Sequence, residues 1–225
     1  ISKKRFQLAT VKEIFTISGV LAALAIPTII SNYLSLDLLN PEVIKISGSI
    51  MIFLAIIGAF IFYFFYEESI NFKSQSISLA QIISFLKNNK KISHFALITF
   101  FNLLANNFTA NLFIIFVSNY LGLKDYAGYL LILYFTITLI STPLWYFFGK
   151  RFSNMYLLQL GTIITIFGFF FVAFTSANNW ELYILVIFIT GVGIGVDLII
   201  PQIELADILD NNKDNRLSQI FTSFF

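Results

Sequence analysis

Six long apolar segments dominate this chain and restrict the folds that it can adopt. A helix needs about 20 mostly apolar residues to cross about 30 Å of hydrocarbon. Segments 13–34, 43–66, 93–121, 126–148, 155–176 and 182–206 meet this requirement. Only 12% of the residues are charged, whereas a soluble domain has roughly 25%. We therefore expect an all-α membrane protein with six transmembrane helices, whose main partner is the lipid bilayer.

The composition also argues against several functions. The chain has no Cys and one His, His94, so disulfides are excluded and a thiolate or multi-histidine metal site is not expected. Its net charge of +2 is small and its basic residues form no patch, so nucleic acid is not an expected partner. No phosphate-binding loop is present, and we expect neither a cofactor nor a metal.

Lysine and arginine predict the orientation of the chain. Basic residues concentrate in cytoplasmic loops of membrane proteins. If the N-terminus is cytoplasmic, only Lys45 and Lys124 lie outside, and Lys12 sits at the mouth of the first span. The inside residues are Lys3, Lys4, Arg5, Lys73, Lys87, Lys90, Lys91, Lys150, Arg151, Lys213 and Arg216. We expect both ends to be cytoplasmic, with interfacial aromatics at span ends, among them Tyr33, Tyr66, Tyr126, Trp145, Trp180 and Tyr183.

The connection 67–92 is much longer than the others and predicts a boundary between two bundles. Ser78-Leu-Ala-Gln81 has the form of a helix capping box, and apolar residues follow it at helical spacing. The segment therefore favours a short amphipathic helix on the cytoplasmic surface. A solvated linker with a helical turn is the alternative.

The third span carries polar side chains on two faces. At about 100° per residue, Asn102 and Asn106 share one face, and Asn107 and Asn111 lie nearly opposite. We expect the Asn102 and Asn106 face to line an aqueous cavity. The alternative is that all these amides bond neighbouring helices.

The last span combines small residues with two carboxylates. Gly191 and Gly195 are spaced for close helix packing. Asp197 and Glu204 lie on one face, and an ionised group inside a membrane costs about 3 kcal/mol or more. Asp197 is therefore a candidate for binding a solute or proton, or else forms an ion pair with another span. Glu204 is a second cavity candidate or an interfacial group, and Lys12 is a cavity cation or an ordinary flanking charge.

Four stretches together resemble the melibiose-carrier type, the glycoside–pentoside–hexuronide:cation symporter family of the major facilitator superfamily. They are Phe101-Asn-Leu-Leu-Ala-Asn106, Pro143-Leu-Trp145 with Gly149-Lys-Arg151, Gly191 to Asp210 followed by Arg216, and Lys12 placed seven residues before Gly19. The family usually has Arg where Lys12 stands, so any bidentate contact there is lost. The segment Asn211–Asn215 is not closely similar to the family.

The resemblance covers essentially the whole chain and implies an internal fragment, helices five to ten of a twelve-helix major facilitator fold. Residues 1–66 would be the last two helices of the N-terminal bundle, and 67–92 the central cytoplasmic loop. Residues 93–225 would hold the first four helices of the C-terminal bundle and the start of the next.

The expected function is cation-coupled symport, driven by H⁺ or Na⁺, of a sugar, glycoside or related small polar solute in the plasma (inner) membrane, with the full-length chain acting as a monomer. Alternatives are transport of a lipid or amphiphile, and an intramembrane enzyme, for which no nucleophile–base motif is found. The expected cavity residues are Lys12, Asn102, Asn106, Asp197 and Glu204. A cytoplasmic charge network is expected from Lys150, Arg151, Asp207, Asp210 and Arg216.

Overall fold

A computed structural model describes residues 2–38, 40–65, 84 and 87–210 of the chain. Among these residues, six helices are long and apolar enough to cross a membrane, and no strand is present. They are α1 (Ser2–Leu34), α2 (Pro41–Phe65), α4 (Lys90–Ile115), α5 (Ala127–Gly149), α6 (Asn154–Val172) and α7 (Glu181–Asp210). The prediction of an all-α membrane fold with six transmembrane helices is confirmed.

The helices extend beyond the apolar segments that predict them. α1 begins at Ser2 instead of residue 13, and α4 begins at Lys90, inside the connection predicted as 67–92. A helix satisfies its own backbone hydrogen bonds, so it can continue past the hydrocarbon into a charged sequence. The predicted amphipathic helix, which starts at the capping box of Ser78, lies outside the described residues.

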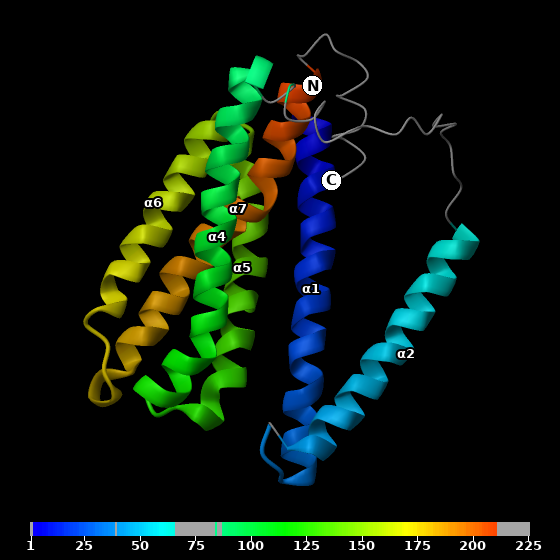
Figure 1. Cartoon of the computed structure of the whole chain (residues 1–225), viewed down its shortest axis with the longest axis vertical. Helices are drawn as coiled ribbons and strands as arrows, with labels where there is room; N and C mark the ends of the chain where they lie inside the picture. Colours follow the sequence, from blue (N-terminus) through cyan, green and yellow to red (C-terminus); the bar gives the residue numbers. More distant parts are fainter. Residues whose placement is uncertain (1, 39, 66–83, 85–86, 211–225) are drawn as a thin grey trace.

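The helices form a bundle with two recognisable ends (Figure 1). The end where α1, α4 and α6 begin is called the Lys12 end, and the end with the turn between α1 and α2 is called the Asp37 end. α4, α5, α6 and α7 group together, and α1 lies beside α5 and α7. α2 is close to α1 near the Asp37 end and diverges from it toward the Lys12 end.

Small residues allow α7 to pack closely between α5 and α6. A Cβ atom on Gly193 would lie 2.9 Å from the carbonyl oxygen of Gly161 in α6. A Cβ atom on Gly191 would lie 3.2 Å from the carbonyl oxygen of Tyr134 in α5. Since lipid tails are as apolar as side chains, membrane helices associate through such close contact. A Cβ atom on Gly195 would meet the side chains of Ser141 and Trp145 of α5, so the packing interpretation of Gly191 and Gly195 is confirmed.

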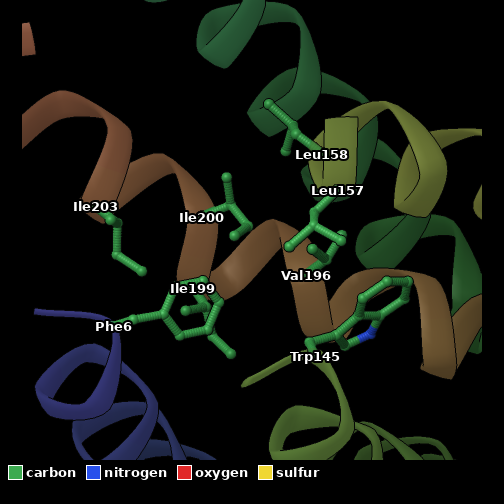
Figure 2. Packing of buried hydrophobic residues seen from close by; sticks show 8 residues of the cluster. All are labelled: Phe6, Trp145, Leu157, Leu158, Val196, Ile199, Ile200 and Ile203. Carbon is green, nitrogen blue, oxygen red and sulfur yellow. The ribbon is translucent and has the colours of Figure 1, made fainter. Parts of the chain in front are cut away.

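The largest buried cluster surrounds α7 near the Lys12 end and joins four helices (Figure 2). α7 provides four of its members, and Figure 2 shows Phe6 of α1 beside Ile199 and Trp145 of α5 beside Val196. The full set is Phe6, Trp145, Leu157, Leu158, Val196, Ile199, Ile200 and Ile203. This cluster attaches α1 to the other helices.

Two of the aromatic residues predicted at the membrane interface belong to the core instead. Trp145 is 5% exposed and its indole N–H donates to the carbonyl oxygen of Val192 at 2.8 Å. Tyr183 is 7% exposed and packs against Phe113 and Phe116. Both stand near helix ends in the sequence, but the helices place them toward neighbours, so the interfacial prediction is wrong for this pair.

α4 continues directly into a π-helical segment, η1 (Phe116–Tyr120). The N–H of Leu121 donates to the carbonyl oxygen of Phe116 at 3.0 Å, five residues back. Val117 is fully buried in this turn. Gly122 follows with φ of +72°, a conformation that glycine adopts without strain, and turns the chain toward α5. Two 3₁₀ turns, η2 (Lys124–Tyr126) and η3 (Ala177–Asn179), precede α5 and α7.

We predict that Gly193→Ala destabilises the protein by about 1–3 kcal/mol, because the added methyl group overpacks the α6–α7 contact. Thermal unfolding in detergent, followed by loss of the monodisperse chromatographic peak, measures the effect. Gly58→Ala in α2 is the matched control, since nothing lies within 4 Å of the position that its added methyl group would take. Equal melting temperatures for the two variants would contradict the packing role of Gly193.

Candidate solute and cation site

Three of the predicted cavity residues meet between α4 and α7. Asn102 and Asn106 lie one turn apart on α4, and the Asn106 amide N–H donates to the Asn102 side-chain oxygen at 3.4 Å. Both amides interact with the carboxylate of Asp197 on α7. The sequence spacing that placed the two asparagines on one helix face therefore brings them to the same neighbour.

Asp197 has an unsatisfied oxygen inside the protein. Its Oδ1 atom is buried without a hydrogen-bond partner. Among the described residues no basic side chain forms an ion pair with it, which removes the ion-pair alternative for this part of the chain. A buried acceptor without a partner costs about 1–3 kcal/mol, and more when it is charged. The site is therefore chemically suited to receive a proton, a cation or a hydroxyl donor.

A tyrosine that the sequence analysis did not select belongs to the same environment. Tyr134 of α5 lies within electrostatic range of Asp197. It is partly buried and packs against a second buried cluster, which includes Leu130, Tyr183 and Ile187. Its phenol is a hydrogen-bond donor and acceptor, and its ring offers an apolar face. An aromatic residue within an apolar span gives no sequence signal of such a role.

Glu204 lies further along α7, about 10 Å from Asp197 at ~1.5 Å per residue. Its Oε2 accepts a hydrogen bond of 3.1 Å from the Asn154 amide at the start of α6. It also lines a cavity of about 810 Å³ at the Lys12 end, together with Lys90, Lys91 and His94 of α4. The structure thus separates Glu204 from the group around Asp197 and ties it to α6.

Lys12 belongs to α1 and contacts α7 on a different face from the one that carries Asp197. Its Nζ donates to Oε1 of Gln202 at 3.0 Å. The same Gln202 amide donates from Nε2 to Oε2 of Glu13 at 3.5 Å and to the carbonyl oxygen of Leu198 at 3.0 Å. Glu13 is only 5% exposed. It was missed because a Lys-Glu pair at the start of an apolar span looks like an ordinary polar flank.

The predicted charge network is only partly within the described side chains. The Lys150 ammonium lies 4.4 Å from the centre of the Tyr146 ring and 5.1 Å from that of Phe147. Asp207 accepts from Asn154 at 3.4 Å, and Arg151 is exposed. The side chain of Asp210, like Arg216, lies outside the described set. The network remains a prediction.

The asparagine face opposite Asn102 is exposed. The amides of Asn107 and Asn111 donate to carbonyl oxygens of their own helix, at 2.8 Å each. Within the described residues, the side-chain hydrogen bonds of this face therefore stay inside α4. The two faces of α4 consequently differ, and only the Asn102 face meets a carboxylate.

Six helices that are long and apolar enough to cross a membrane define an integral membrane protein. The family model described as MFS/sugar transport protein matches residues 2–225. The chain belongs to this family, and it is a secondary transporter of the major facilitator kind with part of that fold. The family points to a transporter and not to an enzyme. Comparisons with curated proteins and with solved structures found no match.

We predict that Cys introduced at Asn102 or Asn106 reacts with a membrane-impermeant thiol reagent in the full-length protein. The reason is the expectation that this face lines an aqueous cavity, since thiolates form only where water reaches them. Gel-shift labelling in intact membranes measures the reaction. Phe108→Cys is the matched control, since Phe108 lies on the same helix and is 64% exposed, a position that lipid would cover. Equal labelling at Phe108, or none at the asparagines, would favour interhelical bonding instead.

Proposed function

We propose that this protein is a cation-coupled symporter of a sugar, a glycoside or a related small polar solute. The observation that carries the proposal is the buried, unpartnered Oδ1 of Asp197 beside the amides of Asn102 and Asn106. A carboxylate retained inside a membrane protein marks a substrate or ion pathway by default. The family membership supports a transported solute of the sugar class.

The three residues have complementary roles in this proposal. Asp197 binds the coupling ion, H⁺ or Na⁺, which neutralises its charge. Asn102 and Asn106 each offer an amide donor and an amide acceptor, the pairing that sugar hydroxyl groups need. The phenol and ring of Tyr134 add a polar handle and an apolar face for a sugar ring. Binding of ion and solute at one place provides the differential affinity that coupling requires.

The arrangement of helices supports alternating access. We propose that α1 and α2 belong to the first bundle of a twelve-helix fold and that α4 to α7 belong to the second. α1 is bonded to the other bundle near both of its ends. Asn32 donates to the Tyr129 hydroxyl of α5 at 2.6 Å near the Asp37 end, and Lys12 donates to Gln202 of α7 near the Lys12 end. Rocking of one bundle against the other would open these contacts in turn.

The membrane placement follows from the same proposal. The Lys12 end faces the cytoplasm, as the distribution of lysine and arginine favours, and the protein resides in the plasma (inner) membrane. The full-length chain acts as a monomer, because one chain supplies both bundles. Lys150 and Arg151 with Asp207, Asp210 and Arg216 would brace the second bundle at that end through contacts worth about 1 kcal/mol or less for each exposed pair.

We predict that Asp197→Asn lowers gradient-driven uptake by about tenfold or more at near-normal membrane abundance, because the isosteric amide keeps the packing but cannot bind the coupling ion. Full-length protein in proteoliposomes is tested with radiolabelled hexoses, pentoses, hexuronides and disaccharides under imposed H⁺ or Na⁺ gradients. Glu181→Gln, an exposed change at the start of α7, is the control and should transport normally.

Two results would count against this function. Wild-type uptake by Asp197→Asn would remove Asp197 from coupling. Failure of wild-type protein to transport any sugar of the panel, together with transport of a fluorescent lysophospholipid, would favour the amphiphile alternative.

A further inference from the structure

The junction between α1 and α7 contains a carboxylate that the proposed solute site does not use. Glu13 lies about 10 Å inside the apolar span that begins at Phe6, at ~1.5 Å per residue, and it is 5% exposed. Its described hydrogen bond is the long one from Gln202 Nε2, at 3.5 Å. A nearly buried carboxylate with one weak donor needs a further source of charge compensation.

Lys12 provides that compensation through Gln202. Lys12 and Glu13 are consecutive, so they do not face each other on a helix, but both contact the same amide. The ammonium can only donate and the carboxylate can only accept, which fixes the Gln202 oxygen toward Lys12 and its nitrogen toward Glu13. The three groups form a neutral bridge from α1 to α7.

The charged surroundings of Glu13 are simple. Among the side chains of α1 that the structure describes, the charged neighbour of Glu13 is Lys12, and α7 presents the uncharged Gln202. At the end of α5 the ionisable groups are Tyr146, whose ring packs on Phe6, Lys150, which lies over that ring, and the exposed Arg151. Glu204 and Asp207 of α7 are bound to Asn154 of α6. A change in the charge of Glu13 therefore acts mainly on Lys12 and Gln202.

The donor set at this junction suits a proton and not a metal ion. A hard metal cation takes several oxygen ligands, but the Gln202 oxygen already accepts from Lys12, and the Gln202 nitrogen is directed at Glu13. Only the carboxylate oxygens remain, and the Lys12 ammonium acts on them electrostatically. Among the described residues no cluster of acidic or histidine side chains that could hold a metal is found.

We propose that Glu13 is a proton-binding site whose occupancy controls the bridge between α1 and α7. Ionised Glu13 holds the Gln202 amide by a charge-assisted contact, and the bridge is neutral. When Glu13 gains a proton, that contact weakens and Lys12 loses its counter-charge. An uncompensated ammonium favours the state in which it reaches water, so protonation favours separation of α1 from α7 at the Lys12 end. The inference rests on the proposed two-bundle arrangement.

The test measures the distance between the two bundles as the pH changes. Cys residues replace Leu8, which is 70% exposed on α1, and Phe152, which is 46% exposed between α5 and α6. Full-length protein, with any other cysteine replaced, carries spin labels at both positions in proteoliposomes. We expect the ratio of long to short distances to rise from pH 8 to pH 5, by at most about tenfold per pH unit, since one proton is bound.

Two variants distinguish the site from a general effect of acid. Glu13→Gln keeps the size of the side chain but cannot ionise, so its distances should be independent of pH and resemble those of the wild type at pH 5. Gln202→Met keeps the length but removes the bridge, so long distances should dominate throughout. Glu42→Gln, at the exposed start of α2, is the matched control and should respond to pH as the wild type does.

The outcomes separate this inference from the proposed transport function. Asp197→Asn should lose uptake but keep the pH-dependent distance change; if it retains uptake, the solute site is wrong and the Glu13 inference stands. A wild-type pH response in Glu13→Gln or in Gln202→Met overturns the inference. So does a wild-type protein whose distances do not change with pH.

Discussion

Close contact of α7 with α5 and α6 is the constraint on which the rest of this structure depends. Lipid provides no hydrophobic force that would push helices together, so shape must hold them. Gly191 approaches the α5 backbone, and Gly193 approaches the α6 backbone. Because the glycines of α7 place no side chain at these two contacts, the helix sits deep in the bundle. Its remaining faces are then available for α4 and α1, where the buried carboxylates meet their amide partners.

The polar residues use these two remaining faces for different purposes. Toward α4, Asp197 meets two neutral amides and keeps one oxygen free. Toward α1, Gln202 is a neutral amide that meets two opposite charges. In the first arrangement, one oxygen of Asp197 has no hydrogen-bond partner and is therefore available to bind a ligand. The second is balanced in charge and therefore holds two helices together until that balance is disturbed.

Much of this could be predicted from the sequence because polar residues are conspicuous in apolar segments. The six spans, the shared face of Asn102 and Asn106, and the packing role of the glycines follow from length and helical period alone. Glu13 was missed because it is the first residue of the predicted segment 13–34, and Gln202 because it is uncharged. Trp145 was assigned to the interface because it stands near the end of its apolar segment. Its burial depends on how α5 and α7 are rotated relative to each other, and the sequence of one segment does not show this.

The π-helical turn η1 at the end of α4 has a consequence for how this chain tolerates changes in length. A π turn holds one residue more than an α turn, and such turns persist where a single inserted residue has been accommodated. Loss of one residue within Phe116–Tyr120 would restore regular α geometry there and rotate the following residues by about 100°. Leu121, which follows the turn and is 2% exposed, would then be rotated away from its buried position. Because Asn102 and Asn106 precede this turn, a change of one residue here leaves their register on α4 intact.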